Sequence, residues 1–241
     1  MKTRSPSSPV VLTDSCLCPY FEDGRISTIE CVIPDTGSIR KYHKFLARGY
    51  RRTGHIFYHN VCTDCSDCVP LRLEAESFIL SASQKRTLRN NKDIRVSVRS
   101  RPSLTFQKMA LYEKYVRSKH AAGKDSVPED PLPALIALYA GYDRIIEMEY
   151  YVGKRLIAAG IVDEGEDSLS SNYFYYDTDY LDRRPGVFSI LQEISLARSM
   201  GKRYYYLGFY IEGNRKMAYK IYFRPNQTYK NGKWTGFLGK K

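Results

Sequence analysis

The chain has 241 residues, of which 43% are hydrophobic and 27% charged, and its formal charge is +12. This composition excludes a disordered tail and is sufficient for one large or two small folded domains. The excess of basic side chains predicts a polyanionic partner or an anionic membrane surface, with a merely solvated basic surface as the alternative.

Residues 1–13 are predicted to be a flexible lead, and residues 1–9 lack the apolar core of a signal peptide. No run reaches the roughly eighteen apolar residues of a membrane span, so we expect a cytoplasmic protein that does not act at a membrane. Basic residues dominate 36–63, 84–101 and 198–241. Acidic residues dominate 125–182, so the folded chain is expected to have a basic face and an acidic face.

In the first half of the chain, residues 36–50 carry the apolar spacing of an amphipathic helix that ends at Gly49. A turn-rich cysteine segment follows, then a strand over 71–80 and a basic helix after Ser83. A further helix is predicted from Ser103, a suitable N-cap, to Gly123. Three prolines among acids then favour an exposed loop over 123–133.

The second half of the chain predicts strands over 145–152, 155–162 and 171–176, with a tight turn between the first two. A helix follows, with an apolar stripe that starts at Val187 and a stop at Gly201. A buried aromatic strand is then expected over 203–211. This order of three strands, a helix and a strand is the core order of the acyltransferase fold of acetyl-CoA N-acetyltransferases.

Several motifs resemble one known family, in the same order along nearly the whole chain. The N-terminal ones are Cys18-Pro19-Tyr20, Gly49-Tyr50-Arg51-Arg52-Thr53-Gly54, Cys62-x2-Cys65-x2-Cys68-Val69-Pro70-Leu71-Arg72 and Ser83-Gln84-Lys85-Arg86. The C-terminal ones are Tyr112-x2-Tyr115-x4-His120-x2-Gly123, Ser170-x2-Tyr173-Phe174-Tyr175-Tyr176-Asp177, Tyr206-Leu207-Gly208-Phe209-Tyr210-Ile211 and Met217-x-Tyr219-Lys220. Together they resemble the arginyl/leucyl-tRNA-protein transferases, and the length resembles their compact bacterial branch.

The resemblance implies an α/β protein with a GNAT-like acyltransferase domain over 101–241 and a small Cys-containing acceptor-recognition module over 14–100. It implies an aminoacyltransferase that moves leucine, or less readily arginine, from charged tRNA to the N-terminal Asp or Glu of proteins, which marks them for degradation. The alternatives are a CoA-dependent N-acetyltransferase and a non-enzymatic protein that binds RNA or senses metal.

Recognition of an acidic N-terminus calls for arginine, because a guanidinium bonds a carboxylate through two parallel hydrogen bonds. The candidates for acceptor binding lie in or beside the family-like motifs: Tyr42, Tyr50, Arg51, Arg52, Arg72 and Arg86. Each arginine has a surface position as its alternative, and Tyr42 falls on the apolar stripe of its helix, which favours packing in the core.

The donor tRNA calls for contacts to phosphate and to the terminal adenine. A helix that opens at Gly186 presents free N–H groups and a positive dipole end to a phosphate, and Arg183 and Arg184 add charge. Tyr204, Tyr205 and Tyr206 alternate across the two faces of a strand, so some are expected in the core and others are available to stack on the adenine. Tyr206 and Tyr210 are the tyrosine candidates for donor binding. The family usually has Ser-Leu-Gly where this chain has Arg184-Pro185-Gly186, so one residue of that motif is retained.

The chemistry itself makes modest demands, because an aminoacyl-tRNA is an activated ester and an α-amine with a pKa near 8 is partly neutral at cytoplasmic pH. No cofactor is required. Tyr173 and Asp177 are predicted to orient the amine or relay its proton, with a turn-forming role as the alternative for Asp177. Lys220 is predicted to contact a phosphate or the oxyanion.

Five cysteines suggest a possible metal site. Cys62, Cys65 and Cys68 have ligand spacing, and Cys16 or Cys18 supplies a fourth thiolate for zinc or an iron-sulfur cluster. The alternative is a set of buried or redox-sensitive thiols.

Overall fold

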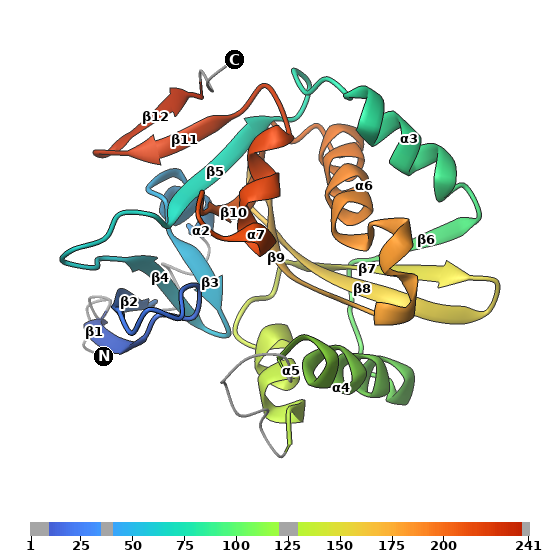
Figure 1. The fold of residues 1–241 in the computed structure, drawn as a ribbon, viewed down its shortest axis with the longest axis horizontal. Helices are drawn as coiled ribbons and strands as arrows, with labels where there is room; N and C mark the ends of the chain where they lie inside the picture. Colours follow the sequence, from blue (N-terminus) through green and yellow to red (C-terminus); the bar gives the residue numbers. More distant parts are fainter. Residues whose placement is uncertain (1–9, 35–40, 121–129, 238–241) are drawn as a thin grey trace, which may run out of the picture.

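The computed structural model describes residues 10–34, 41–120 and 130–237, in which two β-sheets are covered by helices (Figure 1). The smaller sheet has the strand order β1-β2-β4-β3 and the larger has the order β12-β11-β5-β10-β9-β8-β7-β6. The strands of the smaller sheet are β1 (Val10–Leu17), β2 (Ile26–Ile33), β3 (Arg51–Thr53) and β4 (Ile56–Asn60). Those of the larger are β5 (Val69–Glu74), β6 (Ile94–Arg99), β7 (Ile145–Val152), β8 (Arg155–Glu164), β9 (Ser168–Tyr176), β10 (Tyr204–Tyr210), β11 (Gln227–Lys230) and β12 (Lys233–Gly236).

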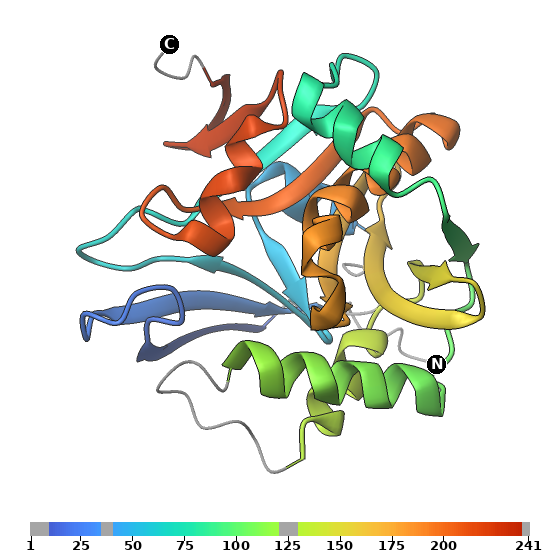
Figure 2. The same cartoon turned by 45° about the vertical axis from the view of Figure 1, so that its right-hand side comes forward.

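The helices cover both faces of the larger sheet. They are α2 (Tyr42–Ala47), α3 (Ala82–Asn90), α4 (Phe106–His120), α5 (Leu132–Tyr139), α6 (Pro185–Ser199) and α7 (Arg215–Ala218), with the 3-10 turns η1 (Thr178–Arg183) and η2 (Tyr219–Tyr222). One core packs α6 against β7, β8 and β10, and α3 lies alongside α6 (Figure 2). The other core joins α2, α4 and α5 to the opposite face. Among the described residues, no helix is long and apolar enough to cross a bilayer.

The functional feature of this sheet is an opening between β9 and β10. The two strands run parallel but are paired only where residues 204–206 face residues 168–170, and they then diverge. A bulge between Tyr206 and Gly208 in the pairing with β5, together with the positive φ of 87° at Gly208, accompanies the divergence. The predicted order of three strands, a helix and a strand is confirmed by β7, β8, β9, α6 and β10.

Several local predictions are corrected by the structure. Residues 10–13 are not a flexible lead but the start of β1, which pairs with β2. The strand predicted over 71–80 ends at Glu74, and the helix predicted from Ser103 begins at Phe106. Helix α5 was not predicted, because Pro131 and Pro133 suggested a loop, whereas proline also suits a first helical turn. The predicted stops and loop within 121–129 lie outside the described residues.

The larger sheet also crosses the predicted domain boundary at residue 100. Strands β5 and β6 come from the segment assigned to the N-terminal module, yet both pair with strands of the acyltransferase-like part. Within the predicted N-terminal module, only strands β1 to β4 form a sheet of their own. The chain is therefore a mixed α/β protein with a small N-terminal sheet beside a large C-terminal one.

Candidate active site

A cavity of about 490 Å³ lies at the opening between β9 and β10. We call it the wedge pocket. Residues from β3, α4, β9, α6, α7 and η2 enclose it, and they include Arg51, Tyr115, Tyr173, Arg184, Gly186, Glu193, Arg215, Lys216, Tyr219 and Lys220. The cavity therefore contains residues from three sets of candidates predicted from the sequence: those for acceptor binding, for donor binding and for catalysis.

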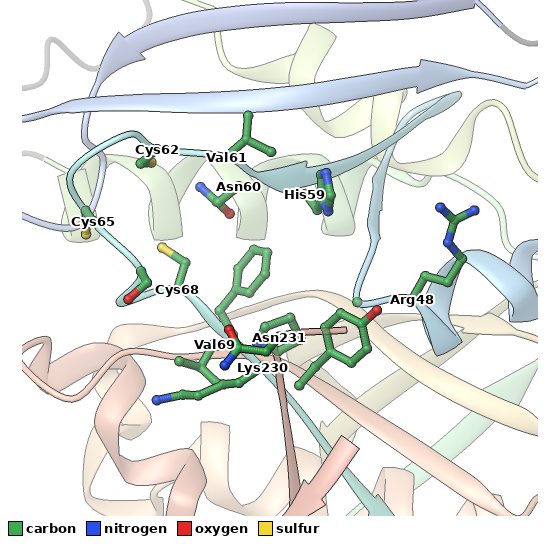
Figure 3. A pocket seen from close by; sticks show the side chains of 15 residues that line it. Arg48, His59, Asn60, Val61, Cys62, Cys65, Cys68, Val69, Lys230 and Asn231 are labelled. Atoms are coloured by element: carbon green, nitrogen blue, oxygen red, sulfur yellow. The ribbon is translucent and has the colours of Figure 1, made fainter. Parts of the chain in front are cut away.

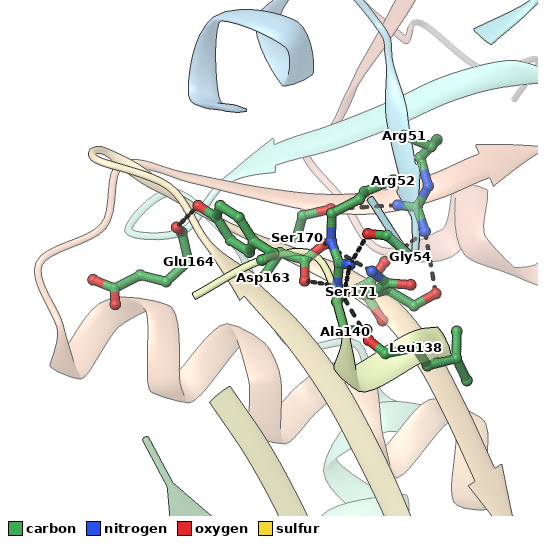
Figure 4. Close-up of polar contacts among 11 residues, drawn as sticks. Arg51, Arg52, Gly54, Leu138, Ala140, Asp163, Glu164, Ser170 and Ser171 are labelled. Atoms are coloured by element: carbon green, nitrogen blue, oxygen red, sulfur yellow. Dashed lines mark hydrogen bonds and ion pairs between the residues drawn. The ribbon is translucent and has the colours of Figure 1, made fainter. Parts of the chain in front are cut away.

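Arg51 fills the point at which the two strands part (Figure 4). Its Nη2 donates to the backbone oxygen of Ser171 at 2.6 Å, and its Nη1 lies 3.4 Å from Ser170 Oγ. A Cβ added at Gly208 would lie 3.1 Å from the guanidinium, so the absence of a side chain there admits Arg51. Arg51 therefore satisfies acceptors on β9 that a continuing β10 would otherwise pair.

The wedge pocket is strongly cationic. Its lining contains a single acid, Glu193, against five basic side chains: Arg51, Arg184, Arg215, Lys216 and Lys220. None of the five forms an ion pair with a carboxylate in the described part of the chain. Cations that converge without internal counter-ions are suited to an anionic ligand.

Lys220 and Glu193 are the titratable pair at the base of this pocket. Burial, together with the nearby charge of Arg51 and against the opposing charge of Glu193, lowers the pKa of Lys220 to about 7. Glu193 is itself buried, which raises its pKa, although it accepts hydrogen bonds from Ser189 Oγ at 2.6 Å and Tyr205 OH at 2.8 Å. Lys220 consequently has a neutral amine available near pH 7.

The N-terminus of α6 forms another wall. Arg184 precedes the helix in a left-handed conformation (φ 54°), and no side chain caps the first turn. Its guanidinium donates to Ser83 Oγ at 2.7 Å and to Thr87 Oγ1 at 3.2 Å, which joins the pocket to α3. A Cβ at Gly186 would approach Tyr219 Oη to 3.2 Å. The first turn of α6, which has no capping side chain, therefore forms part of the cavity wall, and phosphate binding there stays a prediction.

Arg52, the neighbour of Arg51, does not reach the wedge pocket. Its side chain is fully buried and forms two hydrogen bonds to Asp163, at 2.6 and 3.0 Å (Figure 4). It also donates to the backbone oxygens of Gly54, Ala140 and Leu138. The prediction that Arg52 binds the acceptor is corrected, because its donors are already used within the fold.

Arg72 and Arg86 also lie away from the wedge pocket. The Arg72 guanidinium is 4.0 Å from the ring centre of Tyr204 and 4.3 Å from that of Trp234, and it donates to Gln227 at 2.7 Å. Arg86 is exposed on α3. The structure therefore brings one of the four candidate arginines, Arg51, into the cavity, and the other three lie outside it.

The two acceptor-side tyrosines pack in the protein core. Tyr42 is 1% exposed and stacks on Phe57 with ring centres 5.0 Å apart. Tyr50 is 6% exposed, stacks on His59 at 4.2 Å, and donates to Glu30 at 2.5 Å. Neither tyrosine is among the residues that line the wedge pocket.

Of the three catalytic candidates, Tyr173 and Lys220 line the wedge pocket and Asp177 does not. Tyr173 lines the wedge pocket, and burial raises its pKa, so its phenol stays protonated. Asp177 is not among the pocket residues. It caps η1 and accepts from Lys114 at 2.5 Å and Arg155 at 2.7 Å. Burial raises the pKa of Asp177, but these hydrogen bonds outweigh it and hold the pKa below its ordinary value, which corrects the relay role to a structural one.

The remaining donor candidates lie outside the cavity. Arg183 pairs with Asp93 at 2.6 Å, on the α3 side of η1. Tyr206 is 5% exposed and accepts a hydrogen bond from Arg72, while its ring meets Trp234 edge-on. Tyr210 packs on Phe237. The predicted stacking of Tyr206 on a base is corrected, because that ring is enclosed by the core.

Three of the cysteines line a second cavity of about 320 Å³, the thiol pocket, whose lining includes Arg48, His59, Cys62, Cys65, Cys68 and Lys230 (Figure 3). Burial and the neighbouring Cys18, Cys62 and Cys65 raise the pKa of Cys68 to about 12. Cys65 Sγ lies 3.5 Å from an Arg25 donor. In the ranges that the structure describes, no three Cys, His, Asp or Glu side chains are arranged to hold a metal, and zinc or iron-sulfur binding stays a prediction.

Three pocket residues were missed by sequence reasoning: Glu193, Arg215 and Lys216. Glu193 lies three residues after Ile190, beside the apolar stripe of α6, so an acid at a buried helical position was the available signal. Arg215 and Lys216 begin the short α7, which carries no periodic signal. Only the tertiary fold brings α7 over the opening between β9 and β10.

Comparison with known proteins gives the family of this chain. The family profiles for arginine-tRNA-protein transferase match residues 17–86 (N terminus) and 107–230 (C terminus). A protein of Shewanella putrefaciens named aspartate/glutamate leucyltransferase is 34% identical over 229 residues, covering 94% of this chain and 96% of that protein. A protein of the same name from Leptospira interrogans is 33% identical over 216 residues, covering 87% and 82%.

Solved structures give more distant likenesses. FemX aligns with a TM-score of 0.48 at 6% identity, over 86% of this chain and 81% of its own. A domain of a putative lysylphosphatidylglycerol synthetase from Agrobacterium fabrum aligns with a TM-score of 0.46 at 12% identity, over 60% and 46%. These structural likenesses are too distant to bear on function. The family assignment rests on the family profiles and on the relatives that are similar over nearly the full length. The chain belongs to the arginine-tRNA-protein transferase family.

Proposed function

We propose that this chain transfers leucine from charged tRNA to the N-terminal Asp or Glu of a protein, and that the transfer takes place in the wedge pocket. The relatives named aspartate/glutamate leucyltransferase support this choice of donor and acceptor. The observation that carries the location is the set of five basic side chains around one cavity, none of them ion-paired within the described residues. Both substrates are anionic next to their reacting groups, which matches that charge.

The donor enters by its 3′ end in this proposal. The uncapped first turn of α6 offers N–H groups to a phosphate at Gly186, and Arg184 adds charge beside it. Arg184 also touches α3, where the exposed Lys85 and Arg86 continue the basic surface away from the pocket. A tRNA can thus place its terminus in the cavity while its acceptor stem lies over α3.

The acceptor pairs through its acidic side chain with Arg51. This guanidinium is held by the backbone oxygen of Ser171 and by Ser170 and has no carboxylate partner in the described parts of the chain. A substrate carboxylate would supply the missing counter-charge. Lysine or arginine at the N-terminus would instead meet the positive charges of Arg51, Arg184, Arg215 and Lys216, which favours selection of acidic termini.

Positioning supplies most of the catalysis. The tRNA ester is already activated, so neither ATP nor a covalent enzyme intermediate is needed. Holding an ester and an amine in attack geometry can contribute about 7–11 kcal/mol. The hydroxyl of Tyr173, which remains protonated, is a donor in the same cavity for the oxygen that becomes negative during attack.

A transfer assay tests the proposal. The chain is incubated with labelled leucyl-tRNA, arginyl-tRNA or acetyl-CoA, each with peptides that begin with Asp, Glu, Lys or Arg. Leucine is expected on the Asp and Glu peptides alone. Labelling from acetyl-CoA, or of basic but not acidic peptides, would contradict the proposal.

A further inference from the structure

Lys220 is the one side chain of the wedge pocket whose charge state is free to change near neutral pH. Its amine forms no hydrogen bond or ion pair with the residues that the structure describes, although it lines the cavity. The charged and titratable groups facing it come from every surrounding element: Arg51 on β3, Tyr115 on α4, Tyr173 and Tyr176 on β9, Arg184 and Glu193 at α6, and Arg215, Lys216 and Tyr219 beside it. Burial and, after it, the charge of Arg51 favour the neutral amine of Lys220, and Glu193 is the one carboxylate of the lining that opposes them.

Glu193 does not form an ion pair that would hold the Lys220 amine in its charged form. Its two carboxyl oxygens are bonded by Ser189 Oγ and Tyr205 OH, and Ser189 also receives a hydrogen bond from Tyr150 OH at 3.3 Å. All three of these hydroxyl groups are buried. Glu193 is therefore fixed within a closed network beneath the pocket, where it faces Lys220 without forming an ion pair with it.

We propose that Lys220 is the proton carrier of the reaction: its neutral amine accepts the proton released by the attacking α-amine and returns it to the ribose oxygen that leaves. Arg51 and Glu193 act through it as positioning residues, because one disfavours its ammonium form and the other limits that effect. This role rests on the proposed aminoacyl transfer in the wedge pocket. It differs from the fixed phosphate or oxyanion contact expected from the sequence.

The step balances without a further reactant. The nitrogen of the acceptor attacks the ester carbonyl carbon, so a C–N bond forms and the carbonyl oxygen becomes negative. One N–H proton moves to Lys220 Nζ as the nitrogen acquires positive charge. The C–O bond to the ribose then breaks, the carbonyl is restored, and the Lys220 proton passes to the ribose oxygen. The products are an amide and a free ribose hydroxyl, and Lys220 ends neutral.

No other group in the pocket meets the same requirements. Tyr115, Tyr173 and Tyr219 have pKa values that burial raises, so they hold their protons and are poor acceptors. Arg51, Arg184 and Arg215 are permanently charged. Glu193 is occupied at both oxygens, and Lys216 is exposed.

The test compares Lys220→Arg and Lys220→Gln with wild type, using leucyl-tRNA and either an Asp peptide or hydroxylamine as acceptor. Arginine keeps the positive charge but cannot accept a proton, and hydroxylamine is a nucleophile that is weakly basic and needs little help with proton removal. With the peptide, Lys220→Arg is expected to lose about 100-fold or more in kcat. With hydroxylamine, both variants should approach the wild-type rate.

Two further measurements separate this role from others. The wild-type kcat should rise with pH through a limb near 7, and that limb should be absent in Lys220→Arg. Lys154→Arg, an exposed lysine in the turn between β7 and β8, is the control and should behave as wild type. Thermal melting checks that each variant is folded.

Full peptide activity in Lys220→Arg would overturn the proton role, because a fixed charge would then suffice. Equal losses with the peptide and with hydroxylamine would also overturn it and would assign Lys220 to donor binding. Wild-type protein that transfers no leucine to either acceptor would instead refute the proposed function itself.

Discussion

Two arginines that are neighbours in β3 serve two different regions of the molecule. Arg52 enters a closed polar centre, where Asp163 neutralises its charge and backbone oxygens take its remaining donors. Arg51 enters the wedge pocket, where backbone oxygens hold it and no carboxylate balances its charge among the described residues. The comparison shows that an arginine available for substrate is distinguished by its missing counter-ion, since position and residue type are nearly the same.

The largest effect is expected at the closed centre. Arg52→Met leaves Asp163 charged and unpaired in the core, which should cost about 3–5 kcal/mol in the free energy of unfolding. Urea denaturation measures it. Replacing both residues, as in Arg52→Met with Asp163→Leu, should recover part of the loss, whereas an unchanged midpoint in the single variant would show that this centre is not structural.

The wedge pocket should respond in activity. Arg51→Lys keeps the charge but loses the planar pair of donors. The lost interaction should be worth about 1.5–3 kcal/mol, so kcat/KM for an Asp peptide should fall roughly 10- to 150-fold. The unfolding free energy should change less than in Arg52→Met. The contrast between the two regions fails if Arg51→Lys loses stability as Arg52→Met does and keeps its activity per folded molecule.

Arg51 and Arg52 also show which features of the site a local sequence pattern can predict. Adjacent positions of a strand point to opposite faces, so β3 separates Arg51 from Arg52 by geometry alone. Which face holds a counter-ion depended on Asp163, more than a hundred positions along the chain, and no local pattern announces that pairing. The same holds for Arg72, whose aromatic partners include Trp234 near the other end of the chain.

The order of the core elements was predictable because periodicity and turn residues are local signals. Strands β7 and β8 and helix α6 follow them closely, and the Gly201 stop was read correctly. The pocket was harder, because it is made by the divergence of β9 from β10. Its candidates Arg51, Tyr173 and Lys220 came from the family resemblance, whereas Arg215 and Lys216 join the pocket only because the tertiary fold places α7 there.

The basic surface beyond the pocket offers a smaller test. Lys85, Arg86 and Arg89 are exposed on α3 and lack ion pairs within the described residues. Changing all three to Gln should weaken tRNA binding and reduce the slope of log affinity against log salt by about 2–3. Binding is measured by titration at several salt concentrations.

Its matched control removes three other exposed cations, Arg101, Lys154 and Lys233, from other parts of the surface. That control should leave the salt dependence unchanged. A short aminoacylated oligonucleotide, which lacks the acceptor stem, should be used equally well by wild type and by the α3 variant. Equal salt slopes in both triple variants would show that α3 does not contact the tRNA.

The smallest effect concerns Asp177. Asp177→Asn keeps a capping side chain but loses the ion pairs with the half-buried Lys114 and the exposed Arg155, so it should cost about 1 kcal/mol of stability at pH 7. Because the pKa of the folded carboxyl is lowered, its stabilisation is present above the ordinary value of about 3.9 and is lost as pH falls below it.

Urea midpoints of wild type and Asp177→Asn should therefore differ at neutral pH and converge as the pH falls below that range. The transfer rate per folded molecule should not change. A large loss of kcat in Asp177→Asn would return this residue to the reaction.

The wedge pocket as the site of transfer is tested most directly by electron density for a hydrolysis-resistant donor, 3′-leucylamido-adenosine, bound to the protein. The leucyl amide is expected in the cavity between β9 and β10, within reach of Arg51 and Lys220, with its adenosine toward Gly186. Density for the leucyl group in the thiol pocket, or on any surface remote from Arg51 and Lys220, would contradict this assignment.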